Sequence, residues 1–330
     1  MLAPGMTADC VTLPTGSDER RLCKGPGSIK MATKRRHWLQ WVLLTLLVLL
    51  GLAAMAALLF LRGIGFLRAP VYETDRPRLP LEHHPSVLVF SKTNAFIHKD
   101  AIPAAKELLA LMGEEQGWGV FQTDGGGVFN RDDLARFDVV VWNNVTGDVL
   151  TPAQREAFAS WLQSGGGFVG LHAAGDSSHK HWPWYHDTVI RAQFIGHPTN
   201  PQFQQATVRI EQPADPIVGT LGPAWQRTDE WYSFAQSPRA PDLRVLATLD
   251  EASYVPRGLF GASLAMGADH PVIWKHCAGA GRVFYSALGH TADSYAEPAY
   301  REILVRAIRW AGRMNTADRQ PADPLPCETS

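Results

Sequence analysis

The chain has 330 residues, of which 45% are hydrophobic and 19% are charged, and its formal net charge is −1. This hydrophobic fraction excludes general disorder, and the near-zero charge argues against nucleic acid as a partner, because nucleic-acid-binding proteins normally carry a basic excess. Four cysteines in a chain of this length do not form a disulfide scaffold. The apolar residues are unevenly distributed, so these averages conceal segments of different kinds.

The first of these segments is a run of 21 uncharged, mainly apolar residues from Trp41 to Leu61. At ~1.5 Å per residue, such a helix spans roughly 31 Å, about the thickness of the hydrocarbon core of a bilayer. The apolar core of a cleaved signal peptide is usually shorter, about 7–15 residues. The sequence therefore predicts one transmembrane helix over residues 38–62. Cleavage near the alanine-rich stretch 53–57 is the alternative.

Basic residues on the two sides of this helix predict its orientation. Seven precede the apolar run and four lie within the twenty residues behind it. Because basic residues concentrate on the cytoplasmic side, we expect a single-pass protein with a basic cytoplasmic tail over residues 1–37 and a C-terminal part in the periplasm or another extracytoplasmic space. In that outer part lie Cys277 and Cys327, which could form a disulfide, although the sequence does not give the distance between them.

Beyond the helix, the sequence predicts a proline-rich linker over residues 63–85, one globular domain over 86–313 and a flexible tail over 314–330. Short apolar runs alternate with helical patterns, which is typical of an α/β fold with a mostly parallel sheet covered on both faces. The expected strands are 87–90, 118–122, 138–142, 168–171, 206–211, 244–249, 272–275 and 282–287. The expected helices are 101–112, 151–164, 188–194 and 298–311.

In such sheets a ligand site lies beyond the carboxyl ends of the strands. The turn Gly170–Asp176 follows one expected strand and places His172 between small residues, including Ala173 and Gly175. This pattern resembles a nucleophile elbow in which histidine replaces serine or cysteine. An imidazole there can act as an acid, a base or a metal ligand. The alternative is a histidine that only hydrogen-bonds loop backbone.

Other polar side chains occupy comparable positions. His98 follows the first expected strand and His290 follows the strand 282–287. The run from Asp229 to Tyr232 places two carboxylates beside Trp231 and Tyr232, which favours a sugar subsite because aromatic faces cover the apolar face of a pyranose. Adjacent strand residues face opposite ways, so we expect one of the two carboxylates to enter the site; the alternative is a solvated edge.

Two further regions carry weaker signals. The loop from His179 to His186 contains Trp182, Trp184 and Tyr185, which could wall a pocket, but its histidine spacing matches no established metal motif and a solvated loop is the alternative. His270 precedes a strand instead of following one. Gly125–Gly127 is not followed by Gly-Lys-Ser/Thr, and there is no dinucleotide fingerprint, so no nucleotide cofactor is expected.

Together these motifs resemble the ThuA-like (trehalose utilisation) family. The resemblance is carried, in order, by the segments 166–174, 182–185, 194–198, 229–232, 269–274 and 281–291. It implies a class I glutamine amidotransferase-like, flavodoxin-like three-layer sandwich without the amidotransferase cysteine, and a role in sugar use. His98, His172, Glu230 and His290 match motif positions of the family. One departure is Ala214-Asp215-Pro216, where the family commonly has a His-Pro pair, and the apolar helix is not part of the family pattern.

The sequence thus leads to a hypothesis of a membrane-anchored, outward-facing enzyme that acts on a sugar or an oxidised (keto) sugar. The expected catalytic groups are His172, His290, Glu230 and His98. The expected substrate-binding residues are Asp229, Trp182, Trp184, Tyr185, Trp231, Tyr232, His270 and Asp176. A divalent metal is left open, and so is the oligomeric state. The main alternative is a non-catalytic sugar-binding or scaffold module; an amidotransferase that uses Cys277 is disfavoured, because the sequence around it lacks an elbow.

Overall fold

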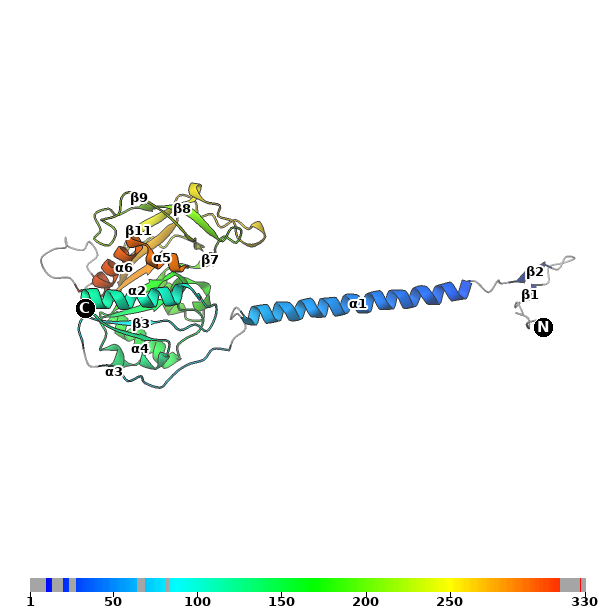
Figure 1. Cartoon of the computed structure of the whole chain (residues 1–330), viewed down its shortest axis with the longest axis horizontal. Helices are drawn as coiled ribbons and strands as arrows, with labels where there is room; N and C mark the ends of the chain where they lie inside the picture. The colour runs from blue at the N-terminus through cyan, green and yellow to red at the C-terminus, as the bar shows by residue number, and fades with distance from the viewer. Residues whose placement is uncertain are drawn as a thin grey trace. The chain divides into compact units, whose positions relative to one another are not determined.

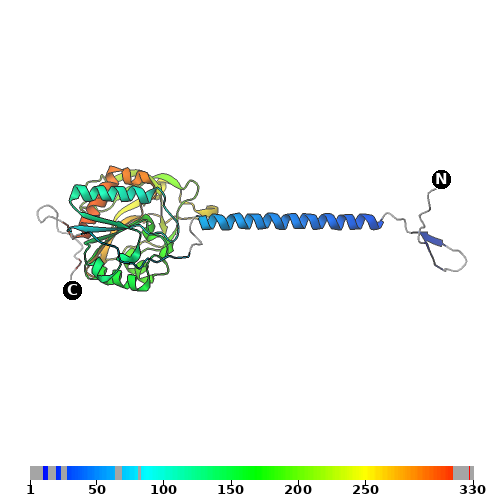
Figure 2. The same cartoon turned by 60° about the horizontal axis from the view of Figure 1, so that its bottom comes forward.

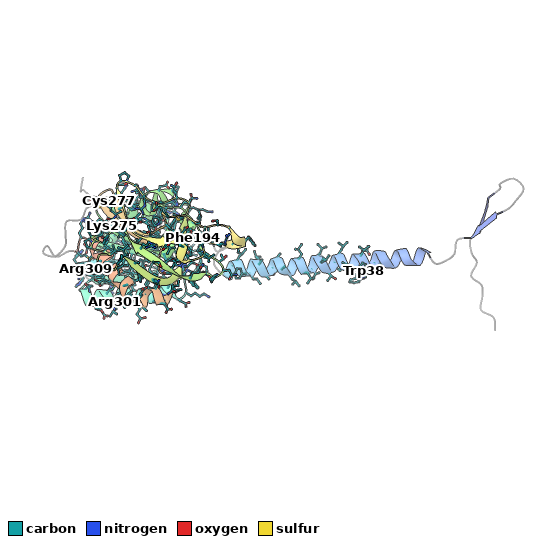
Figure 3. The ribbon with its side chains drawn as sticks, turned by 90° about the horizontal axis from the view of Figure 1, so that it is seen from above. Trp38, Phe194, Lys275, Cys277, Arg301 and Arg309 are labelled. Carbon is teal, nitrogen blue, oxygen red and sulfur yellow. A yellow bond between two sulfur atoms is a disulfide. The ribbon has the colours of Figure 1, made fainter. Side chains whose placement is uncertain are left out.

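The computed structural model describes residues 10–13, 20–23, 28–63, 69–80, 83–314 and 327, which fall into two compact units, 1–63 and 64–330. The first unit contains the antiparallel pair β1 (Cys10–Leu13) and β2 (Arg20–Cys23) and the helix α1 (Ser28–Gly63). Within α1, the stretch His37–Arg62 contains an 18-residue window with a mean hydropathy of 2.8, none of which is buried. Its side chains, Trp38 among them, project outward around the helix (Figure 3). By length and composition, this helix could be a membrane span or a signal sequence.

The second unit is built on a nine-stranded sheet with the order β4-β3-β5-β6-β13-β12-β11-β8-β9. The strands are β3 (Ser86–Phe90), β4 (Gly119–Thr123), β5 (Val139–Asn143), β6 (Gly167–Leu171), β8 (Phe203–Ile210), β9 (Ala224–Glu230), β11 (Leu243–Asp250), β12 (Pro271–Ala278) and β13 (Gly281–Ser286). Every pairing from β4 to β13 is parallel, and every pairing from β13 to β9 is antiparallel. The expectation of a mostly parallel sheet therefore holds for one half of the sheet only.

The parallel half is apolar on both sides because helices cover it. Strands β3, β5 and β6 are buried along their whole length. In two views, α2 (Ala101–Gln116) and α6 (Pro298–Ala311) lie on one side of these strands and α4 (Pro152–Gln163) lies on the other (Figures 1 and 2). The short helices are α3 (Arg131–Leu134) and α5 (Ala292–Ala296). The side chains of Thr151 and Gln154 form a capping box that begins α4, and proline at its first position suits the helix start.

One expectation from the sequence needs correction here. The segment expected as a helix over 188–194 instead contains a π-helix, Tyr185–Ile190, followed by β7 (Phe194–Gly196), which pairs with β10 (Ser233–Phe234). Arg191 adopts a left-handed conformation with φ 63°, which ends the helix.

The segment 69–80, part of the expected linker, lies against the domain. Arg76 donates to Asp133 at 2.6 Å and 3.1 Å, and the Glu73 backbone carbonyl accepts from Gln154 at 2.7 Å. Most of the expected tail 314–330 lies outside the described residues. Cys327 is described and forms a disulfide with Cys277 of β12, with 5.5 Å between the two Cα atoms. The pairing that the sequence left open is thus made.

We predict that Phe158→Ala destabilises the domain by about 3–5 kcal/mol, because this fully buried ring packs against Trp142, Phe168 and Phe129 and its removal leaves a cavity. Denaturant unfolding of the detergent-solubilised chain measures the change. The control is Leu111→Ala on α2, where the side chain is 40% exposed and the expected loss is under about 1 kcal/mol. Equal losses in the two variants would contradict this packing.

Candidate active site

Four side chains from distant parts of the sequence meet at the carboxyl ends of the parallel strands. They are His98, which follows β3, His172, which follows β6, Glu230, which ends β9, and His290, which follows β13. One nitrogen or oxygen atom of each lies within 4.8 Å of one such atom of every other. His98, His172 and Glu230 are buried, and His290 is partly exposed. The four residues expected to be catalytic are therefore brought together, although their catalytic role stays a prediction.

His172 is held by the turn that contains it. Its backbone has φ 47°, in the left-handed region, so the chain reverses sharply as β6 ends. Its carbonyl accepts a hydrogen bond from the hydroxyl of Tyr285 at 2.8 Å. A Cβ atom on Gly175 would lie 2.4 Å from that tyrosine ring, so the turn requires glycine there. The imidazole Nδ1 lies 2.8 Å from the carbonyl of Ala287, which can only accept; Nδ1 therefore carries the proton and Nε2 faces the cluster.

The Glu230 carboxylate lies at the centre of the cluster. Its Oε2 is 2.9 Å from Nδ1 of His290 and 3.3 Å from Nε2 of His172, and these two nitrogens are 3.0 Å apart. Its Oε1 is 3.1 Å from Nδ1 of His197 and accepts a hydrogen bond from Gln202. Burial alone would raise the pKa of Glu230, but the adjacent imidazoles of His172 and His290 hold that pKa below its usual range. Glu230 is therefore an anion at neutral pH.

The neighbouring Asp229 positions this arrangement from outside the cluster. Its two carboxylate oxygens accept the backbone N–H groups of Gly289 at 2.9 Å and His290 at 3.1 Å. They also accept from the Ser294 hydroxyl at 3.1 Å and from Arg227 at 2.9 Å. Because Glu230 faces the cluster and Asp229 faces away, one of the two adjacent carboxylates enters the site, as the alternation of strand residues predicts.

His98 completes the cluster. Its ring centre lies 4.6 Å from that of His290 and 5.1 Å from that of His172, edge to face in both cases. Its side-chain Nδ1 is buried and has no hydrogen-bond partner. Burial and the two neighbouring imidazoles lower the pKa of His98 well below its ordinary value, so this ring is neutral at pH 7 and carries a free lone pair.

Aromatic rings surround the cluster. Tyr232 lies 4.1 Å from the His172 ring, and Phe203 and Phe96 lie 5.1 Å and 6.3 Å from the His290 ring. Phe203 is there because β8 pairs with β9 and places it opposite Glu230. Four residues at the site were not predicted from the sequence: Phe96, Phe203, His197 and Gln202. Only His197 carried a local signal, as a histidine before a proline; the others depend on strand pairing or loop position.

Three other expected substrate-binding residues belong to an aromatic cluster of their own. Tyr185 stacks on Trp142 at 4.6 Å and donates to the Ala174 carbonyl at 2.7 Å. Trp182 and Trp184 pack near Phe158, at 6.0 Å and 6.4 Å between ring centres. Among the described residues, no ring contact joins these three side chains directly to the four cluster residues. Their role in substrate binding remains a prediction.

Trp231 and His270 are also buried in structural contacts. The Trp231 indole donates to the Gln204 carbonyl at 2.8 Å. The His270 nitrogens lie 2.8 Å from the Tyr232 carbonyl and 2.8 Å from the Glu251 carboxylate, so both are occupied. These contacts fix the backbone that carries the Tyr232 ring.

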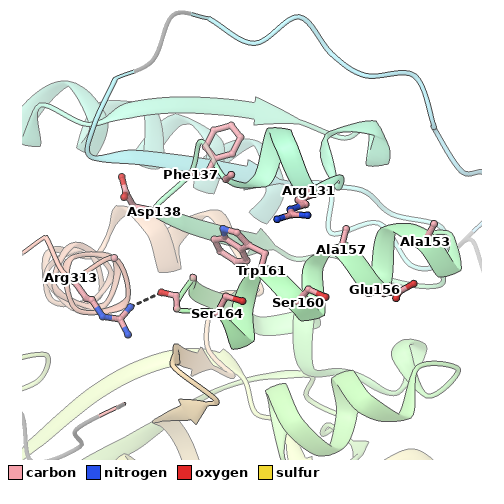
Figure 4. Close-up of a pocket in the computed structure, with 14 residues that line it drawn as sticks. Arg131, Phe137, Asp138, Ala153, Glu156, Ala157, Ser160, Trp161, Ser164 and Arg313 are labelled. Atoms are coloured by element: carbon pink, nitrogen blue, oxygen red, sulfur yellow. Dashed lines mark hydrogen bonds between the residues drawn. The ribbon is translucent and has the colours of Figure 1, made fainter. Parts of the chain in front are cut away.

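Two of the hollows in the described surface differ in their relation to the cluster. A hollow of about 970 Å³ is lined by Arg131, Trp161 and Arg313 (Figure 4), among residues that precede β5 and β6. It therefore lies at the amino ends of the strands, opposite the cluster. A smaller hollow of about 300 Å³ includes Phe194, whose ring contacts Tyr232 at 4.3 Å. None of the four cluster residues lines either hollow; the rings of Phe194 and Tyr232 lie between the smaller hollow and His172.

Helices cover both faces of a parallel half-sheet, so the chain is an α/β protein. Its histidines and carboxylate form a polar site at the strand ends, which is where such folds bind their ligands. The chain belongs to the ThuA family: the family model, described as trehalose utilisation, matches residues 86–311. This membership gives the protein a role related to carbohydrate utilisation.

Solved structures share the fold. A ThuA-like protein from Bacteroides uniformis is 23% identical, with a TM-score of 0.61 over 71% of this chain and 94% of its own. A ThuA-like protein from Parabacteroides merdae is 19% identical, with a TM-score of 0.54 over 74% of this chain and 95% of its own. A search of curated proteins finds no match.

We predict that Asp229→Asn destabilises the chain by about 3–5 kcal/mol and displaces His290, because an amide nitrogen would face backbone N–H donors and leave the buried Arg227 with only Glu297, at 3.5 Å, as a counter-charge. Thermal unfolding measures the loss of stability. The exposed Asp187→Asn is the matched control, and an Asp229→Asn variant as stable as this control would exclude the positioning role.

Asp176 gives a pH prediction. Burial raises its pKa from the ordinary 3.8 to about 6, although hydrogen bonds from Ser178 act in the opposite direction. The unfolded chain thus loses this proton at lower pH than the folded chain, so stability falls by up to ~3 kcal/mol as the pH rises from about 4 to about 6. In Asp176→Asn this decrease is absent. Unfolding free energies of both proteins between pH 4 and 8 test this, and parallel curves would disprove it.

Proposed function

We propose that this protein is a membrane-anchored enzyme that acts on a sugar or an oxidised (keto) sugar through acid–base chemistry of the clustered histidines and Glu230. The convergence of three imidazoles and a carboxylate in a ThuA-family chain carries the proposal. The order of the five parallel strands, 2-1-3-4-5 when renumbered along the chain, is that of flavodoxin-like sheets and supports the three-layer sandwich that the sequence suggested.

The geometry favours proton transfer. The Ala287 carbonyl fixes the His172 tautomer, so the lone pair of Nε2 is available to a substrate proton. Nδ1 of His290 lies 3.0 Å from that nitrogen and 2.9 Å from the Glu230 carboxylate, whose negative charge stabilises an imidazolium on either ring. A keto sugar has an acidic C–H bond next to its carbonyl. Its conversion can begin with transfer of that proton to an imidazole whose protonated form is stabilised by a carboxylate.

Exposed aromatic rings beside the cluster support a sugar as the substrate. The exposed rings of Phe96 and Phe203 flank His290, and a pyranose can stack its C–H face on either ring. The half-buried His197 and the Gln202 amide, both on Glu230, add polar groups for hydroxyls at the same place. The predicted contributions of Trp182, Trp184 and Tyr185 to sugar binding would come from the segment 182–185, which holds all three.

We further infer that α1 spans the membrane, with the ThuA domain outside the cytoplasm. The excess of basic residues before the apolar stretch supports this orientation. The disulfide between Cys277 and Cys327 supports it independently, because disulfides persist in oxidising compartments.

We predict that His172→Ala lowers turnover of a keto disaccharide by ~10²–10⁴-fold, the usual contribution of a general base. Calorimetric titration with disaccharides and their keto derivatives measures binding, and mass spectrometry detects product. His83→Ala is the control, because this exposed ring contacts only the Gly117 carbonyl among its described hydrogen bonds. Unchanged turnover in His172→Ala would refute the assignment; binding without product in the wild type would favour the non-catalytic sugar-binding module.

Topology has its own test. In cells whose outer envelope is permeabilised while the cytoplasmic membrane stays closed, added protease should digest the domain 86–313. The N-terminal tail should stay protected. A tag at each end, read by immunoblot, distinguishes the two sides. Protection of the domain and digestion of the tail would reverse the proposed orientation, and release of the domain in soluble form would indicate a cleaved signal sequence.

A further inference from the structure

We propose that His98, His172, Glu230 and His290 bind one divalent transition-metal ion, with Zn²⁺ as the best match to three imidazoles and one carboxylate. This inference goes beyond the proposed function: with the ion bound, the ligand nitrogens coordinate it, and polarisation of a substrate oxygen by the ion takes the place of base catalysis by His172. It does not depend on that function, because it rests on the positions of the four ligand atoms.

The spacing of the ligand atoms fits coordination to one ion. Bonds of ~2.0–2.2 Å place neighbouring ligand atoms ~3.0–3.5 Å apart around the metal. The three distances among Nε2 of His172, Nδ1 of His290 and Oε2 of Glu230 are 3.0, 2.9 and 3.3 Å. A ring nitrogen of His98 lies within 4.8 Å of these atoms, close enough for a small side-chain adjustment to complete the set.

Hydrogen bonding alone does not account for this convergence. Because Nδ1 of His172 donates to the Ala287 carbonyl, its Nε2 is an acceptor in the neutral ring, and it faces a second acceptor, the Glu230 carboxylate, at 3.3 Å. The proton on Nδ1 of His290 is then shared between two acceptors, Nε2 of His172 and Oε2 of Glu230. The buried Nδ1 of His98 has no hydrogen-bond partner. A cation satisfies these lone pairs together.

The surroundings are those of a metal site. Metal-bound histidines usually donate their other ring N–H to a carbonyl or carboxylate, as His172 does to Ala287. The Glu230 oxygen that faces away from the three cluster histidines lies 3.1 Å from Nδ1 of His197 and accepts a hydrogen bond from Gln202, and Asp229 holds the backbone of His290. A bound ion would supply Lewis-acid polarisation of a substrate oxygen approaching past Phe203 and Phe96.

The test uses the full chain, purified in detergent without a histidine tag and stripped with a chelator. We expect elemental analysis after dialysis against Zn²⁺ to find about one ion per chain, and calorimetric titration with ZnCl₂ to lose ~100-fold or more in affinity in His172→Ala and in Glu230→Gln. His83→Ala should bind like the wild type. Near-ultraviolet circular dichroism of the stripped proteins establishes that each variant is folded.

A spectroscopic variant covers the case in which a deletion fails to fold. In His290→Cys loaded with Co²⁺, a thiolate-to-metal charge-transfer band in the near ultraviolet is expected, and it should be absent from the Co²⁺-loaded wild type. The metal site is overturned if the wild type takes up no stoichiometric ion, or if the ligand variants bind Zn²⁺ as tightly as His83→Ala. Sugar titrations of the stripped wild type separate this result from the proposed function, since sugar binding without metal would leave the function standing.

Discussion

The buried carboxylate of Asp229 is the contact on which the site depends. It accepts backbone N–H groups from the loop after β13 while it belongs to β9, at the opposite edge of the antiparallel half. Because Arg227, two residues earlier on the same strand face, supplies the counter-charge, the pair stays ionised inside the protein. One carboxylate thereby sets the distance between Glu230 and His290.

This contact explains why the two halves of the sheet differ. The parallel half supplies His98 and His172 from the segments that follow β3 and β6. These two strands are held firmly because both of their faces are buried. The antiparallel half folds back through β8 and β9 and delivers Glu230 to the same edge. The site therefore lies where two kinds of sheet meet, and neither half contains it alone.

Placing three imidazoles and a carboxylate in a largely buried site costs desolvation energy, and the structure offsets that cost locally. Glu230 is stabilised by the neighbouring histidines, and His98 stays neutral because burial and its neighbours lower its pKa. Such strongly perturbed groups in one place are typical of functional sites. A fold that needed only stability would gain more from apolar side chains at these positions.

Local sequence determined the parts of this protein that depend on local interactions. Continuous apolar runs predicted β3, β5 and β6, and Thr151 with Pro152 predicted the start of α4, because burial and capping are readable along the chain. The sequence also indicated His172, whose small neighbours permit a sharp turn. It misassigned the end of the expected helix 188–194, because the π-helix ends at Ile190 and Phe194 begins β7, which pairs with β10.

Tertiary structure decided what depends on distant pairing. The polar strand β9 has no continuous apolar run, so only its pairing with β8 defines it and brings Phe203 and Gln202 to Glu230. Contacts between residues far apart in the chain also decide that Glu230, and not Asp229, faces the cluster. The same holds for the disulfide of Cys277. Residue types revealed the chemistry that was available; the strand order decided which of those residues meet.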